Sequence, residues 1–312
     1  MDITFWSLDF TDRIILPAHG PNGGYTSMNS TIEFNGNGRF ELIFNSEKLK
    51  TFAKNHPEGY LVDWGDFQGF ATDYQFGTDN MIFGSHLNSL LHKGVIGTRN
   101  TNGDVQTTLE NLLPRWITLE KDDSITDTSQ YKTDTYLNGD TFVQEYLDTA
   151  NLGYKIYIEN RSLRFKLLKT NHTSLVLSKN NRNMYEMQED FSNKNAAYGG
   201  WYKKSENDDG TKLDTEQWQY INFSQKGGIY GQDIVLGATS PAKAAQELKK
   251  HMVEHNTICK TCNIEYGRDY TLGDVVMLRD GGITHKKKIT SVDLWYEGAT
   301  YHTEPTLTDW EE

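Results

Sequence analysis

The sequence predicts an α+β fold that is mainly β, with two small β-barrel-like domains and an α+β unit between them. Aromatic residues make up 12% of the chain, and glycine, threonine, asparagine and aspartate are frequent, which favours strands and turns. Apolar strand patterns occupy both ends of the chain, whereas the clearest helix lies near its middle. We therefore expect an N-terminal domain over 1–120, an α+β unit over 121–190 and a C-terminal domain over 191–312.

The N-terminal range begins with strand and turn signals. Alternating apolar residues over 31–34 and 40–44 flank Asn35-Gly36-Asn37-Gly38, a strong hairpin signal. A second hairpin is expected over 60–62 and 67–70. Further features are a short helix carrying Leu87, Leu90 and Leu91, an exposed loop over 98–104, and a helix from Leu109 that Pro114 limits.

The middle range combines one helix with one hairpin. Residues 120–140 are polar and are expected to form a loop. Asp140 or Thr141 could cap a helix that ends at Gly153. Strand patterns over 154–158 and 163–167 then enclose a turn at 160–161, which predicts a helix packed on an antiparallel hairpin.

The C-terminal range returns to β-structure around a helical insertion at about 240–255. Pro241 at the first helical position, after Ser240 as the cap, predicts the helix. Strands are expected over 195–202, 218–223, 262–266, 274–278 and 288–292.

The charge of the chain argues against binding to nucleic acid. The formal net charge is -12, so the chain repels phosphate backbones. Lys286-Lys287-Lys288 is the densest basic cluster, and we interpret it as the solvated start of a strand rather than a phosphate site. No apolar run approaches 18 residues, and the acidic N-terminus lacks a signal pattern, so no membrane segment is expected.

The two cysteines form one Cys-x-x-Cys pair. Cys259 and Cys262 follow His251 and His255, so four possible zinc ligands lie at plausible spacing. The histidines, however, fall at the end of an amphipathic helix, and residues i and i+3 of a strand point to opposite faces. We therefore expect neither a metal site nor a cofactor.

Tests for catalytic motifs give no enzyme signature. Asp63 and Asp66 flank Trp64, which could place a sugar above an acid, but a turn between strands explains the same residues. Gly227, Gly228 and Gly231 lack the following helix that a dinucleotide site requires. The aromatic pairs at 201–202 and 295–296 are more typical of a core or a subunit interface than of a carbohydrate platform. We expect no catalytic residues and no enzymatic activity.

Several segments resemble one known family. Residues 266–276, Tyr-Gly-Arg-Asp-Tyr-Thr-Leu-Gly-Asp-Val-Val, and 288–292, Lys-Ile-Thr-Ser-Val, resemble the last β-domain of siphophage tail-hub proteins, which are related to the hub portion of tail-associated lysins. The segments 30–42, 86–91, 151–156, 176–185 and 193–198 are similar to other parts of the family. At 94–96, Gly-Val-Ile departs from the family, where an arginine follows the short helix.

This resemblance implies a structural protein of the virion. Members resemble the baseplate hub of contractile tails, in which two β-barrel domains line a homotrimeric ring at the tail tip. Such a hub closes the tail tube and connects to the distal tail protein, the tape measure protein and receptor-binding or fibre proteins. DNA passes through its lumen without specific binding.

Two other functions stay open. The chain ends just after the last hub strand, so any lytic activity is expected on another chain. The alternatives are a tail-associated cell-wall hydrolase and a host-carbohydrate-binding module.

Overall fold

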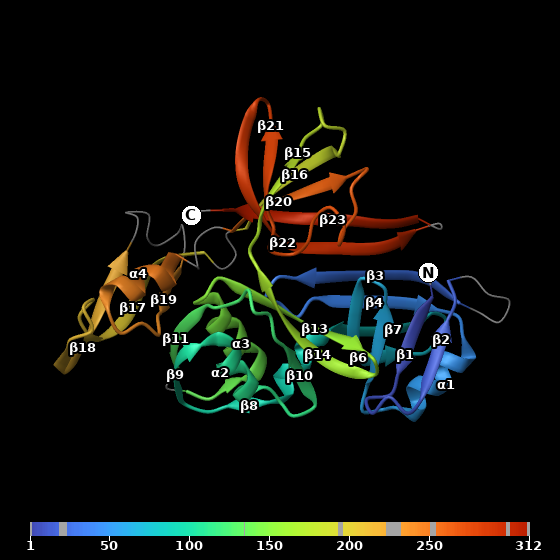
Figure 1. Cartoon of the computed structure of the whole chain (residues 1–312), viewed down its shortest axis with the longest axis horizontal. Coiled ribbons are helices and arrows are strands. Elements are labelled where there is room, and N and C mark those ends of the chain that lie inside the picture. Colours follow the sequence, from blue (N-terminus) through green and yellow to red (C-terminus); the bar gives the residue numbers. More distant parts are fainter. Residues whose placement is uncertain are drawn as a thin grey trace. The chain divides into compact units, whose positions relative to one another are not determined.

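The computed structural model describes residues 2–18, 24–133, 135–192, 196–222, 232–249, 254–297 and 300–310 (Figure 1). The chain divides into two compact units. Unit 1 comprises Met1–Glu186 and Cys259–Glu312, and unit 2 comprises Met187–Ile258. The prediction of a mainly β, α+β protein is confirmed. Residues 259–312 belong to the same unit as the N-terminal strands, whereas the sequence analysis had grouped them with 191–258.

Most strands join one 13-stranded sheet, in the order β16-β20-β23-β22-β3-β4-β7-β6-β5-β1-β2, with β21 on β22 and β15 on β21. Its N-terminal strands are β1 (Ile3–Trp6), β2 (Arg13–Leu16), β3 (Tyr25–Glu33), β4 (Arg39–Phe44), β5 (Tyr60–Trp64), β6 (Phe67–Gln75) and β7 (Asn80–His86). Its later strands are β15 (His172–Leu177), β16 (Met184–Ser192), β20 (Glu254–Thr261), β21 (Val275–Asp280), β22 (Ile283–Glu297) and β23 (Thr300–Asp309). Helix α1 (Glu47–Asn55), which the sequence analysis did not predict, follows β4.

The two N-terminal hairpins expected from the sequence are present. Strands β3 and β4 pair around the Asn-Gly turn, and β5 pairs with β6. At Gly38 the backbone has a φ of +46°, and an added Cβ would lie 2.1 Å from the carbonyl oxygen of Thr31. Only glycine fits this turn, which explains why the hairpin signal is reliable.

Strands from opposite ends of the sequence meet at the centre of this sheet. β3 pairs antiparallel with β22, and the register places Met28 opposite Tyr296 and Ile32 opposite Val292. Leu294 on β22 is fully buried, as is Met28 on β3. Burial of these side chains joins the two ends of the chain into one core.

The middle of unit 1 contains helices and short sheets (Figure 1), and its hydrophobic core also includes Leu61 of β5 and Phe70 of β6. Its helices are η1 (Leu87–Lys93), a 3-10 helix, α2 (Val105–Leu112) and α3 (Gly139–Asp148). Its strands are β8 (Val95–Ile96), β9 (Arg99–Asp104), β10 (Ile117–Glu120), β11 (Thr128–Thr133), β12 (Leu137–Asn138), β13 (Leu152–Glu159) and β14 (Ser162–Lys169). Helix α2 ends before Pro114, as predicted, and β13–β14 is the expected hairpin.

Two expected loops contain strands instead. β9 lies within 98–104, and it pairs antiparallel with β11, which lies within 120–140. Loops were predicted because both segments are polar and lack an apolar strand pattern, and this prediction was wrong. This ribbon is held by backbone pairing and by the Thr101 hydroxyl, which donates to the carbonyl of Tyr131 at 3.0 Å. The cap of α3 also differs, since Asn138 occupies the N-cap position and Asp140 lies inside the first turn.

Residues 262–266 do not form the predicted strand. β20 ends at Thr261, and Asn263 adopts a positive φ of 59°, which extended backbone does not allow. The following strands, β21 and β22, contain residues 275–278 of the segment expected at 274–278 and all of the segment expected at 288–292.

The described part of unit 2 contains a three-stranded sheet and one helix, together with the adjoining ends of β16 and β20. The strand order is β18 (Lys212–Asn222), β17 (Ala197–Glu206), β19 (Gln232–Val235), and α4 (Pro241–Lys249) packs on β17. The Ser240 hydroxyl accepts from the backbone N–H of Lys243 at 3.4 Å, so the predicted cap is confirmed. The core contains Ala197, Tyr202, Leu236, Ala238, Ala244 and Leu248. In the part of the chain that the structure describes, no helix is long and apolar enough to cross a membrane.

The β3–β22 contact can be tested by truncating its core. We expect Leu294→Ala to lower the free energy of unfolding by about 2–5 kcal/mol, because the cavity left by a fully buried leucine cannot refill. Ile283→Ala is the matched control on the same strand, since Ile283 is 63% exposed. Urea unfolding followed by circular dichroism measures both changes. Equal midpoints for the two variants would contradict a core at this strand pair.

Candidate functional site

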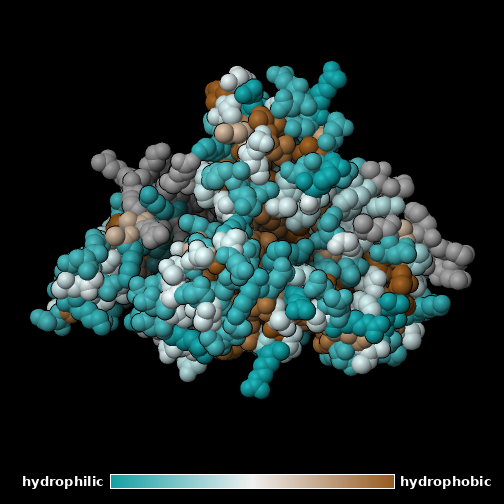
Figure 2. All heavy atoms as spheres, in the orientation of Figure 1, coloured by the Kyte–Doolittle hydropathy of each residue, from teal (hydrophilic) through white to brown (hydrophobic). Residues whose placement is uncertain are grey.

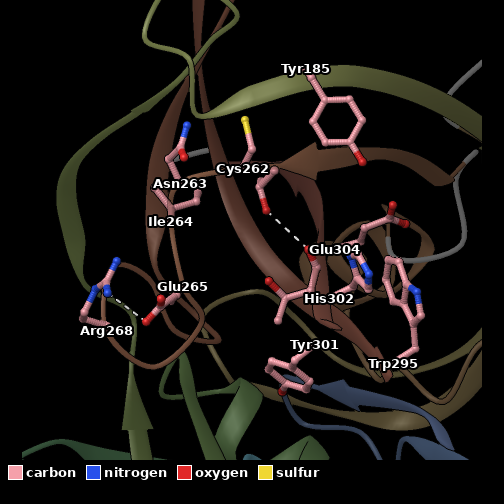
Figure 3. Close-up of a pocket in the computed structure, with 12 residues that line it drawn as sticks. Tyr185, Cys262, Asn263, Ile264, Glu265, Arg268, Trp295, Tyr301, His302 and Glu304 are labelled. Atoms are coloured by element: carbon pink, nitrogen blue, oxygen red, sulfur yellow. Dashed lines mark hydrogen bonds and ion pairs between the residues drawn. The ribbon is translucent and has the colours of Figure 1, made fainter. Parts of the chain in front are cut away.

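The described surface is mainly hydrophilic on the face shown in Figure 2, with hydrophobic residues in small separate groups. One cleft of about 390 Å³ lies in unit 1, against the sheet formed by β20, β22 and β23 (Figure 3). It is lined by Tyr185, Thr261, Cys262, Asn263, Ile264, Glu265, Arg268, Trp295, Tyr301, His302, Thr303 and Glu304.

Aromatic rings form one side of the cleft. Trp295 and His302 lie directly opposite each other on β22 and β23, and their rings stack with centroids 5.1 Å apart and an interplanar angle of 13°. Figure 3 shows Tyr185, from β16, across the cleft from this pair. Tyr185 is 58% exposed, so its ring is available to a partner.

The charges around the cleft are largely paired. Lys260 forms a 2.8 Å ion pair with Glu186, and at the other end Arg268 pairs with Glu265 at 2.8 Å (Figure 3). Burial raises the pKa of Glu304, which lies near Asp293 and Glu186. The cleft therefore presents hydrogen-bonding and aromatic groups rather than a net charge that would attract phosphate.

The four possible zinc ligands do not form a described site. Cys259 is buried, which raises the pKa of its thiol to about 12, whereas the Cys262 thiol donates to the carbonyl of Arg182 at 3.3 Å. His255 belongs to strand β20 and not to the end of a helix, which corrects the sequence analysis. His251 lies outside the described residues. Among the described residues, no group of three acidic, histidine or cysteine side chains could hold a metal ion.

The Asp63, Trp64 and Asp66 cluster forms the end of a buried hairpin. Trp64 is fully buried, and its ring packs edge-on against Tyr301 with centroids 5.7 Å apart, so it cannot stack on a sugar. The Tyr301 hydroxyl donates to Asp66 at 3.0 Å. Asp63 accepts from Gln68 at 3.1 Å, and burial raises the pKa of its carboxyl. These contacts fit the turn between strands that the sequence favoured.

The lysine cluster has a structural role. Lys287 is 4% exposed and pairs with Asp309 at 2.7 Å. The ammonium of Lys288 lies 3.8 Å from the ring centroid of Phe34, and burial lowers its pKa. Lys286 is exposed near the start of β22, as expected, but the interpretation of a solvated cluster was wrong for Lys287 and Lys288, which are buried and half-buried. Gly227, Gly228 and Gly231 lie outside the described residues.

In each aromatic pair, the two side chains lie in different environments. Tyr202 belongs to the core of unit 2, whereas Trp201 is 46% exposed. Trp295 lines the cleft, and the ring of Tyr296 packs against Tyr25 with centroids 5.9 Å apart. The cleft has no signature in the sequence, because its lining joins Tyr185 to Trp295 and His302, which lie more than 100 positions away from it.

The fold is shared with phage tail proteins. No protein-family model matches the chain, and no curated protein matches its sequence. A tail protein from Neisseria meningitidis superposes with a TM-score of 0.57 at 10% identity, covering 98% of this chain and 96% of that one. A prophage tail protein from Listeria monocytogenes gives 0.55 at 14%, covering 100% and 95%. A chain from the phage P2 baseplate gives 0.51 at 8%, covering 99% and 98%. The chain therefore has the fold of phage tail and baseplate proteins, which confirms the resemblance at the level of fold.

One buried histidine makes stability depend on pH. Burial lowers the pKa of His86 from 6.5 to about 3, so the folded protein keeps this imidazole neutral. As pH falls below 6.5 the unfolded chain takes up a proton that the folded chain cannot, and stability is lost until about pH 3.

We expect the wild-type protein to lose about 2 kcal/mol more than His86→Gln between about pH 6.5 and about pH 5. Urea unfolding at both pH values measures the loss for each protein. The comparison uses the pH dependence alone, because the substitution also removes the acceptor for the Asn88 N–H. Equal pH dependence in the two proteins would refute a neutral His86.

Proposed function

We propose that this chain is a structural, non-enzymatic hub protein at the tail tip of a long-tailed bacteriophage. The observation that carries the proposal is that known tail proteins share the fold over at least 95% of both chains. Because the shared fold extends over the whole chain, the proposal applies to the whole chain and not to one module of it. The burial of Trp64, which removes the platform for a sugar at Asp63 and Asp66, supports the non-enzymatic reading of that cluster.

In this proposal three copies form a ring that closes the tail tube. The proposal takes the N-terminal and C-terminal strand groups of each copy as two similar sections, so that a trimer has six sections that fit onto sixfold tail proteins. Exposed aromatic residues support an assembled state, because large exposed rings are typical of interfaces. Trp116 is 50% exposed and Tyr136 is 77% exposed in unit 1.

The partners follow from the position at the tail tip. The hub connects to the distal tail protein, the tape measure protein and receptor-binding or fibre proteins. The genome passes through its lumen during ejection, and the protein is assembled into virions in the cytoplasm of the host bacterium.

The assembly is tested by mass. We expect native mass spectrometry to give about 107 kDa, three times the 35.7 kDa of the chain, and electron-microscopy class averages to show a threefold ring. The chain is measured alone and together with the distal tail protein, because the ring can require that protein in order to close. A stable monomer or dimer in both samples would contradict the ring.

The charge of the lumen is tested separately. A trimer carries 3 × -12, or -36, formal charges, and DNA must pass without being held. We expect lumen residues that are acidic or uncharged, and no gel shift of duplex DNA even at about 50 mM salt. Acidic outer loops such as Asp208-Asp209 could carry the charge instead. A lumen dominated by lysine and arginine, with salt-dependent retention of DNA, would overturn this prediction.

A further inference from the structure

The cleft in unit 1 contains polar side chains that the protein itself does not use. Within the described part of the chain, four of its lining side chains have no hydrogen-bond partner, namely Tyr185, Trp295, His302 and Glu304. Other polar groups of the cleft are engaged. The Thr261 hydroxyl donates to the carbonyl of Thr303 at 3.3 Å, and both Cys262 and Asn263 donate to the carbonyl of Arg182. The four free side chains are therefore the ones available to a ligand.

Strand alternation brings three of the free side chains onto one face. His302 and Glu304 are two residues apart on β23, so both point to the same side of the sheet. Trp295 lies directly opposite His302 on β22, and their rings are stacked with centroids 5.1 Å apart. Figure 3 shows Tyr185 across the cleft from this pair, and its ring is 58% exposed. A ligand in the cleft therefore has aromatic rings on two sides.

The free groups need both donors and acceptors from a ligand. An indole N–H only donates and a carboxylate only accepts, whereas a tyrosine hydroxyl and a neutral imidazole do both. The hydroxyl groups of a sugar also donate and accept, and the C–H face of its ring is apolar enough to pack against an aromatic ring. The cleft volume of about 390 Å³ lies within the range of small-ligand sites. These features together fit a sugar ring.

A proline-rich peptide, which also binds between aromatic rings, fits this cleft less well. Proline residues offer carbonyl acceptors but have no N–H to donate. On binding such a peptide, the Glu304 carboxylate would lose water without gaining a donor, which is unfavourable for an ionised group. A sugar hydroxyl supplies the donor that this carboxylate needs.

The charges around Glu304 favour an uncharged sugar. Asp293 lies directly opposite Glu304 on β22, and Glu186 is close enough to act on the same carboxyl group. The ammonium of Lys260 is nearby as well, but it is paired with Glu186 at 2.8 Å. An anionic sugar would bring a further negative charge beside these carboxylates, and the Coulomb repulsion would oppose its binding.

We propose that this cleft binds a neutral sugar, a hexose or N-acetylhexosamine unit of an oligosaccharide. The sugar ring packs between Tyr185 and the stacked pair of Trp295 and His302, and its hydroxyl groups donate to Glu304 and accept from the Trp295 N–H. This gives Trp295 a binding role, whereas its sequence pattern is more typical of a core or an interface. All of these residues belong to unit 1 of a single copy, so the site does not require the proposed ring.

The test uses the full chain and saturation-transfer NMR, which detects weak binding of small ligands. The probes are the trisaccharides of glucose and of N-acetylglucosamine, the anionic trisaccharide of galacturonic acid, and hexaproline. We expect saturable transfer to a neutral trisaccharide, and binding weaker by about fivefold in Tyr185→Ala and in Trp295→Ala. Trp116→Ala is the matched control and should bind as the wild type does, since Trp116 is 50% exposed in unit 1 and does not line the cleft.

A charge exchange tests the role of Glu304. Glu304→Lys should weaken the neutral trisaccharide and admit the galacturonic acid trisaccharide, a gain that a damaged fold does not produce. Absence of transfer to both neutral trisaccharides, or equal binding by the wild type, Tyr185→Ala and Trp295→Ala, would overturn the proposal. Binding of hexaproline without binding of sugar would also overturn it, in favour of a proline-rich segment as the occupant. None of these outcomes depends on whether the chain forms a ring.

Discussion

Strand β3 is hydrogen-bonded to β22 across about 260 positions of sequence, and the Ser30 hydroxyl donates to the carbonyl of Leu294. A pairing at this separation requires the chain to close a long loop before it gains contact energy. The gain comes from burial, since Met28, Val292 and Leu294 are all fully buried. The N-terminal hairpins and the last three strands share one sheet only because this pairing forms. The cleft lined by Trp295 and His302 lies on β22 and β23, and β22 is the strand that pairs with β3.

The turn between β3 and β4 also holds the middle region of unit 1. The Asn35 side chain donates to the carbonyl of Leu152 at 2.8 Å, and the Asn37 side chain donates to Asp140 at 2.8 Å. Asn88, which is 1% exposed, donates to the carbonyl of Gly36 and accepts from the N–H of Ile156. A buried amide such as that of Asn88, whose nitrogen and oxygen are both hydrogen-bonded, fixes the relative position of the elements it joins, because a shifted arrangement would leave it unpaired. The asparagines that favour a turn in sequence therefore also carry contacts over more than 100 positions.

The sequence predicts elements whose cause is local. The hairpin at Gly38, the helix begun by Ser240 and Pro241, and the end of α2 before Pro114 each depend on one or two residues with restricted backbone geometry. It does not predict β9 and β11, whose polar residues form a ribbon only because each is opposite the other. The interior position of Lys287 is equally hidden, because a buried lysine needs its partner Asp309, which lies on another strand. The candidate cleft belongs to this second class, since it brings Tyr185 together with Trp295 and His302, which lie more than 100 positions later in the sequence.

The contacts of three lysines in unit 1 are relevant to the proposed passage of DNA. Lys287 pairs with Asp309, Lys288 lies over Phe34, and Lys155 is directed to the carbonyl of Asp66 at 3.5 Å. Burial lowers the pKa of both Lys155 and Lys288, so these groups are partly removed from water as well as engaged with other residues. Phosphates are attracted by hydrated, accessible cations, and a lysine that serves the core contributes little to that attraction. A chain with net charge -12 that also places several of its lysines in internal contacts presents a surface more acidic than its composition implies. These lysines stabilise the fold through internal contacts and add little positive charge to the surface. Such a surface suits a protein that is proposed to surround DNA without holding the duplex.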